Sequence, residues 1–263
     1  MRPYIAILIA RIRVLLQYRE AAIAGFGTQL FWGLMRVMIF TAFYKSVNTP
    51  QPMTLDETRN YVWLGQALLV IMPWNLDRDV AAMIRSGNVA FELVKPVDLY
   101  WFWFHRALAF RSAPAILRAI PMFIVAGIFF GLHPPSSVES GIAFFVSVLA
   151  AFLLSASITV LMGITLFWTI SGEGVVKIVP SLVMLFSGLT VPLPLFPDWA
   201  QPIINLLPFR GLMDIPFRLY MGHIPAHEAS FIIFTQLIWT SLIIMFGRWL
   251  FVRASGRIII QGG

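Results

Sequence analysis

Five long apolar segments decide what this chain can fold into. They lie near residues 24–44, 61–83, 112–132, 141–170 and 229–251. A helix needs roughly 20 mostly apolar residues to cross roughly 30 Å of hydrocarbon. Because a spanning segment in lipid must satisfy its own backbone hydrogen bonds, these windows predict membrane-spanning helices. We therefore expect an all-α membrane protein.

The charged residues support this interpretation. Only 12% of the residues are charged, 59% are hydrophobic, and the mean hydropathy is +0.82, which is too apolar for a soluble globular protein. The net charge is +7, but 16 of the 19 basic residues are arginines that lie singly between apolar runs, so nucleic acid is not an expected partner. The chain has no cysteine, which excludes disulfides and thiolate metal sites.

A sixth span is predicted near residues 175–190, although this segment is short and contains Pro180. With the N-terminus in the cytoplasm, 14 basic residues fall inside, one lies within a span, and only four fall outside: Lys45, Arg59, Arg210 and Arg218. Cytoplasmic segments retain positive charge, and the C-terminal arginines lie inside only if the number of spans is even. The sequence therefore predicts six spans, with both termini cytoplasmic.

Residues 1–263 are expected to form one domain, because no Gly/Ser linker or charge run divides them. No internal repeat is evident, so the usual sequence indication of a secondary transporter is missing. Residues 1–22 place apolar side chains at helical spacing with Arg11 and Arg13 between them, which predicts an amphipathic helix at the membrane interface. The alternative is that these residues begin the first span.

The segment 84–98, in the largest predicted cytoplasmic loop, should contain a short amphipathic helix. Asn88 is a suitable N-cap and Pro96 a stop, which leaves room for about two turns. Such a helix would place Val89, Leu93 and Pro96 on one side, and Glu92 and Lys95 towards water. A helix held there is a suitable contact for a soluble partner; the alternative is a structured connector.

The segment 188–216 is apolar but rich in proline, so it cannot form one continuous helix. Apolar, broken backbone at the outer surface predicts a re-entrant segment packed within protein, acting as an outer gate. The expected gate residues are Pro192, Pro194, Phe196, Pro197 and Trp199. A plain interfacial loop anchored by Trp199 is the alternative.

Two further features lie within the predicted spans. Small residues recur every fourth position in the fourth span, at Ala151, Ser155, Thr159 and Gly163, and predict close packing against several helices; a substrate path is the alternative. Arg36 is the one charge well inside a span. It is expected either to extend outward to the interface or to face a cavity, where it would meet substrate or another subunit.

Enzymatic motifs are missing. A P-loop requires Gly-Lys followed by Ser or Thr, and each of the three lysines follows a residue other than glycine. His223 and His227 have the spacing of zinc ligands, but Pro225 between them argues against the required helix. The chain itself is thus expected to bind no cofactor or metal and to catalyse no reaction.

The order of these parts resembles the membrane subunit of type-2 ABC exporters. In that family an N-terminal amphipathic helix precedes six spans, a coupling helix joins spans 2 and 3, and re-entrant helices lie between spans 5 and 6. The run Arg85-Ser86-Gly87-Asn88 through Leu93-Val94-Lys95-Pro96-Val97-Asp98-Leu99-Tyr100 and the ending Ile260-Gln261-Gly262-Gly263 are similar to a bacterial subgroup of largely uncharacterised permeases.

The resemblance implies a permease driven by ATP that separate cytosolic ATPase subunits bind with Mg and hydrolyse. A second permease would complete the transporter, with a heterodimer favoured over a homodimer, in the lipids of the cell inner membrane. The implied ATPase contacts are Arg85, Gly87, Asn88, Phe91, Glu92, Lys95 and Pro96. The competing interpretations are an ATP-independent transporter or channel, an intramembrane enzyme, and a scaffold.

Overall fold

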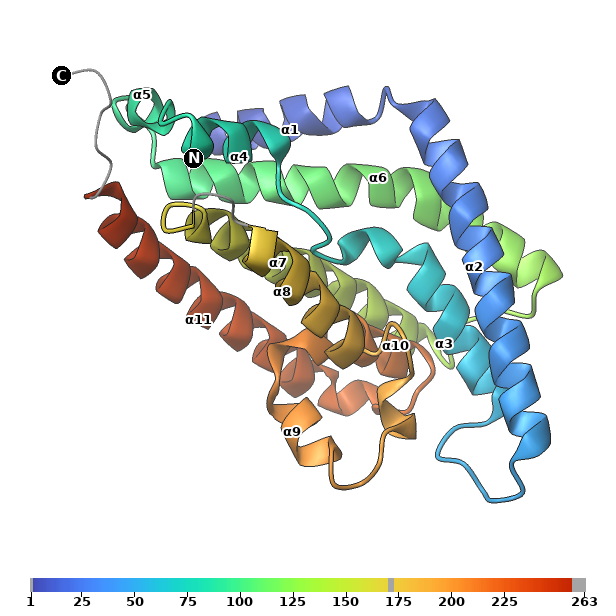
Figure 1. Cartoon of the computed structure of the whole chain (residues 1–263). Coiled ribbons are helices and arrows are strands. Elements are labelled where there is room, and N and C mark those ends of the chain that lie inside the picture. The colour runs from blue at the N-terminus through green and yellow to red at the C-terminus, as the bar shows by residue number, and fades with distance from the viewer. Residues whose placement is uncertain (1, 170–172, 257–263) are drawn as a thin grey trace.

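The computed structural model describes residues 2–169 and 173–256, and the secondary structure in these ranges is helical throughout (Figure 1). The all-α prediction is confirmed. Four helices are long and apolar enough to cross a membrane. They are α2 (Arg19–Ser46), α6 (Leu99–Phe129), α7 (Val138–Thr165) and α11 (Ala229–Ser255).

The shorter helices fill the space between and beside these four. They are α1 (Arg2–Leu15), α3 (Leu55–Ala67), α4 (Arg78–Arg85), α5 (Val89–Leu93), α8 (Glu173–Phe186), α9 (Gln201–Leu206) and α10 (Asp214–Tyr220). The 3-10 turns are η1 (Leu69–Ile71), η2 (Leu193–Leu195), η3 (Pro208–Leu212) and η4 (Ala226–Glu228). The short additional span predicted at 175–190, which is the fifth span in chain order, thus corresponds to the 14-residue helix α8.

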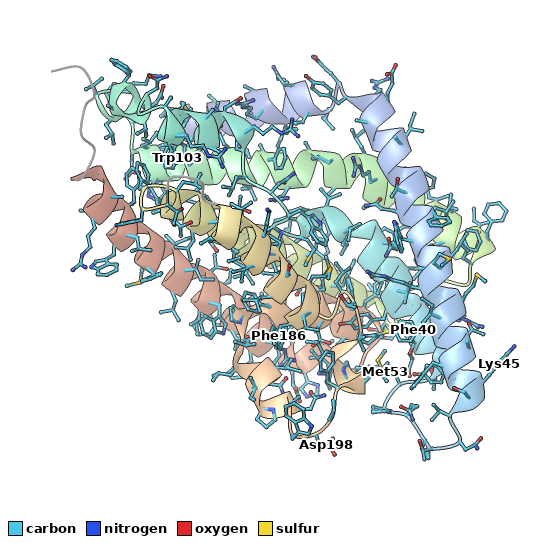
Figure 2. All side chains as sticks on the ribbon, in the orientation of Figure 1. Phe40, Lys45, Met53, Trp103, Phe186 and Asp198 are labelled. Atoms are coloured by element: carbon cyan, nitrogen blue, oxygen red, sulfur yellow. The ribbon has the colours of Figure 1, made fainter. Side chains whose placement is uncertain are left out.

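The helices α1, α4 and α5 lie along one edge of the molecule, near the start of α6, whereas α9 lies at the opposite edge (Figure 1). Figure 2 shows the same separation, with Trp103 near the first edge and Lys45 and Asp198 towards the other. A turn at Leu16–Tyr18 separates α1 from α2, so the first span begins after α1. The structure therefore differs from the alternative in which residues 1–22 begin that span.

The window 61–83 is not a continuous helix, which differs from the prediction. Helix α3 ends at Ala67, and Pro73, which has no backbone N–H, lies in the connector to α4. Side chains satisfy the carbonyl groups that the break releases: Trp74 Nε1 donates to Leu69 O at 3.1 Å and Ser155 Oγ donates to Ile71 O. Tertiary contacts thus replace the helical hydrogen bonds at this position.

Helix α6 begins 13 residues earlier than the window 112–132 predicted. The side chain of Asp98 accepts a hydrogen bond from Trp101 N at 3.2 Å and caps the helix. Arg106 and Arg111, assigned from the sequence to a cytoplasmic loop, therefore lie within a 31-residue helix. Its prolines, Pro114 and Pro121, do not interrupt it.

The main core lies where α3, α7 and α10 meet. Trp63, Leu154 and Phe217 are fully buried there, one from each helix. A second core joins α4 and the start of α6 to the end of α7 around Tyr100 and Trp103. These two cores fix the positions of the two candidate functional segments.

Candidate functional site

The segment 84–98 folds as a turn and a short helix. Gly87 adopts a φ of +74°, which favours glycine, and α5 then covers only five residues. Asn88 lies at the N-cap position, as predicted, but it has helical φ and ψ and its side chain makes no capping bond, which differs from a typical cap. The predicted length of about two turns is likewise too long.

The apolar side chains of this segment face mostly outward. Val89 is buried against the second core, but Phe91 is 69% exposed and Val94 is 83% exposed. Leu93, predicted to lie on the same side of the helix as Val89, is also exposed. Glu92, predicted to face water, is mostly covered and pairs with Lys95 at 2.6 Å. Arg85, Gly87, Asn88 and Pro96 are exposed.

A network of charges ties the start of α4, which precedes this segment, to α1 and α6. Arg106, which is buried, lies 2.7 Å from Asp77 and 2.8 Å from Asp79, and Arg11 reaches Asp79 at 2.7 Å. Hydrogen bonds from Arg11 and Arg106 lower the pKa of Asp79. Asp77 and Asp79 therefore hold the start of α4 against Arg106 of α6, and Asp79 also holds it against Arg11 of α1.

At the opposite end, the segment 188–216 is a broken backbone held by side chains. Arg36 Nη1 donates to Leu189 O at 2.6 Å, and the amide of Gln201 donates to Leu193 O at 2.9 Å and Phe196 O at 3.1 Å. Arg36 thus has a backbone partner that neither sequence alternative included. Among the expected gate residues, Pro192 is buried, Pro194 and Phe196 are half-buried, and Pro197 and Trp199 are exposed.

A buried acidic side chain joins this segment to α3. Asp214 accepts a hydrogen bond from Tyr61 Oη at 3.2 Å and lies 3.5 Å from Arg210 and 4.0 Å from Arg218. No periodic or motif signal in the sequence pointed to Asp214. Arg210 and Arg218 follow the i,i+4 spacing around it, which was the only local indication of these pairs.

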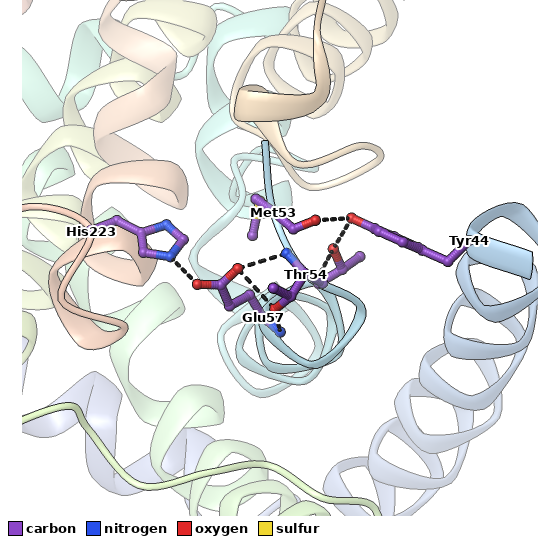
Figure 3. Close-up of polar contacts among 6 residues, drawn as sticks. Tyr44, Met53, Thr54, Glu57 and His223 are labelled. Carbon is purple, nitrogen blue, oxygen red and sulfur yellow. Dashed lines mark hydrogen bonds and ion pairs between the residues drawn. The ribbon is translucent and has the colours of Figure 1, made fainter. Parts of the chain in front are cut away.

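A second polar cluster closes the same end of the molecule (Figure 3). Thr54 and Glu57 form a capping box at the start of α3, and His223 Nε2 lies 2.6 Å from Glu57 Oε1. Tyr44 Oη donates to Met53 O at 2.7 Å and fixes the preceding loop to α2. Burial opposes ionisation of Glu57, but its hydrogen bonds with Thr54 and His223 outweigh this and lower its pKa.

The small residues of α7 contact several neighbours. Ala151 and Ser155 are buried in the main core, and Ser155 bonds the η1 turn. Thr159 accepts a hydrogen bond from Arg111 of α6 at 3.4 Å. A Cβ added at Gly163 would meet no atom within 4 Å, so close approach does not explain that glycine.

No group of three His, Asp or Glu side chains in residues 2–169 and 173–256 could hold a metal ion. His223, one of the two histidines with zinc-like spacing, contacts Glu57 instead. The ending at Ile260–Gly263, which is similar to the bacterial subgroup, lies outside the described residues.

Among protein families, residues 30–262 match the family model described as an ABC-2 family transporter protein. No curated protein matches the chain.

Proposed function

The chain belongs to the ABC-2 family of transporter proteins, and from this premise we propose that it is the permease subunit of an ATP-driven exporter. The ATP and Mg would be bound by a separate cytosolic ATPase, in keeping with the lack of a P-loop in this sequence. A second permease subunit, different or identical, would complete the transport path across the membrane.

The observation that carries this proposal is the exposed apolar surface of the segment 84–98. Phe91, Leu93 and Val94 are exposed within four consecutive residues, while Val89 anchors the helix beneath them. Contiguous exposed apolar side chains on a polar loop are typical of protein contact sites. This surface suits an ATPase subunit that docks from the cytoplasm.

Motion at this surface has a route into the membrane helices. The segment follows α4 directly, and α4 is tied to α6 and α1 by the ion pairs of Asp79 with Arg106 and Arg11. Because Arg106 is buried, separating these groups would leave an uncompensated charge, so α4 and α6 should move as one body. A push on α5 would thereby reach the long helix α6.

The proposed topology has six spans, with both termini in the cytoplasm of a cell whose inner membrane holds the protein. Helices α3 and α8 would supply the second and fifth spans, at roughly 20 Å each. Both are shorter than the hydrocarbon layer, so the η1 connector and the broken outer segment would complete the crossings. The segment 188–216 would then face outward as the gate.

A matched pair of valine substitutions tests the docking surface. Val94 is 83% exposed on the segment 84–98, and Val138 is 78% exposed at the opposite end of the molecule, in the first turn of α7. We expect Val94→Glu to abolish binding of the partner ATPase subunit, and Val138→Glu to leave it unchanged. Charge reversal at Glu92 and Lys95 should uncouple ATP hydrolysis from transport in liposomes.

The two valine variants, Val94→Glu and Val138→Glu, should retain normal helicity and normal elution from a sizing column. Equal ATPase binding by the two valine variants would refute the docking surface. Transport by the purified chain alone in liposomes would refute the ATP-driven exporter itself and favour a channel or secondary transporter.

A further inference from the structure

A cavity of about 220 Å³ lies between α2, the connector after η1, and α6. Its polar lining comes from all three parts of the chain, whereas the resemblance assigned these residues no role. The polar and aromatic lining residues are Gln29, Trp74, Asn75, Phe110, Arg111 and Arg118. Arg111 and Arg118 are seven residues apart, so they lie on the same face of α6 about two turns from each other.

Both arginines are without a carboxylate partner in the part of the chain that the structure describes. Arg111 is 2% exposed, and its Nη2 donates to Asn75 O at 2.6 Å while its Nε has no partner. Arg118 Nη2 donates to Ala21 O at 3.1 Å, and its Nε is also unpaired. Positive charge in a membrane helix is costly, so these guanidinium groups favour an anion beside them.

Gln29 supplies the independent observation that a ligand belongs here. Its side chain is on α2, lines the cavity, and the residue is only 2% exposed. Neither Oε1 nor Nε2 has a hydrogen-bond partner within the described residues. Buried amide groups are almost always hydrogen-bonded, so the unpaired amide indicates a group that fills the cavity.

The sequence of α2 also makes room for Arg118. A Cβ added at Gly25 would lie 2.6 Å from Nη1 and 2.7 Å from Nε of Arg118, so only glycine lets the guanidinium rest against α2. A Cβ at Gly27 would meet nothing within 4 Å. The close approach is therefore specific to Gly25, which lies one helical turn before Gln29.

We propose that this cavity binds the phosphate, or a similar oxyanion, in the headgroup of a membrane amphiphile. Guanidinium groups carry only donors and pair with phosphate oxygens in a fork geometry, and the Gln29 amide adds a further donor. Gln29 lies roughly 15 Å along α2 from its first residue, and α2 exposes Ile23, Phe31 and Trp32, an apolar surface for the acyl chains. The proposal does not depend on coupling to an ATPase.

Binding to the full chain in a neutral detergent tests the proposal. The probes are short-chain phosphatidic acid, the same diacylglycerol without phosphate, and inorganic phosphate, each followed by native mass spectrometry. We expect phosphatidic acid to bind and diacylglycerol not to bind. Equal binding of diacylglycerol would overturn the anion site, and equally tight binding of inorganic phosphate would overturn the amphiphile as its source.

Two glycine variants provide the control. Gly25→Ala should displace Arg118 and weaken phosphatidic acid binding about tenfold or more, the loss of one charge-assisted hydrogen bond, whereas Gly27→Ala should bind normally. Both changes favour the helix, so neither should unfold the chain. Gln29→Leu should weaken binding without lowering the unfolding midpoint. Unaltered binding by Gly25→Ala and Gln29→Leu would overturn the site.

Discussion

Gly188 begins the proposed outer gate, and its replacement by alanine should destabilise the protein through two separable effects. Its φ of +89° lies in the left-handed region, which costs a residue with a Cβ about 1–2 kcal/mol. The new Cβ would also lie 3.2 Å from Leu193 Cγ and still closer to Tyr61 Oη. Overpacking of this kind costs about 1–3 kcal/mol, which gives a total of about 2–5 kcal/mol.

The crowding cannot be relieved easily, because the tyrosine is fixed. Tyr61 is buried and donates to Asp214 Oδ1 at 3.2 Å, so its hydroxyl group cannot swing away without leaving a buried carboxylate short of a partner. In a Tyr61→Phe background, which removes the crowded oxygen, Gly188→Ala should therefore cost less than in the wild type. The difference measures the coupling between the two positions.

Gly131→Ala is the matched control, since Gly131 has a φ of +71° but no atom within 4 Å of an added Cβ. It should lose only the backbone contribution, about 1–2 kcal/mol. Free energies of unfolding can be measured by titrating sodium dodecyl sulfate into dodecylmaltoside micelles while following helicity by circular dichroism. If Gly188→Ala costs no more than Gly131→Ala, the contact between Gly188 and Tyr61 is refuted.

Two further predictions concern the same end of the molecule. Arg36→Gln should lose the hydrogen bond to Leu189 O, lower the free energy of unfolding by about 1–3 kcal/mol, and impair transport while assembly stays intact; unchanged transport would discard a functional role for Arg36. The lowered pKa of Glu57 stabilises the folded state above the usual carboxyl pKa of 4.5 and ceases to do so as the pH falls through the folded value. The unfolding midpoint of Glu57→Gln should therefore depend less on pH below about 4.5, and an unchanged acid dependence would contradict this reasoning.

The long helices could be predicted from the sequence because their signal is local. Length and apolar composition alone predicted α2, α7 and α11, as well as the second part of α6. The same patterns assigned the first part of α6 to a loop, because its aromatic and basic residues do not form an apolar run. Its beginning depends on the Asp98 cap and on packing against α1, Tyr4 of which stacks on His105 at 5.5 Å.

Only the tertiary structure decided how the polar groups are paired. Arg36 and Leu189 are 153 residues apart, as are Tyr61 and Asp214, and no periodicity of either segment relates them. The outward direction of Phe91 and Val94 is likewise a result of tertiary packing, because Val89 is the residue of α5 that packs against α6 in the second core. Hydrophobicity determines which segments enter the bilayer, since it is a property of each segment alone. Which buried donor meets which acceptor depends on the packing of the assembled helices, because the low dielectric of the interior makes every unpaired group costly.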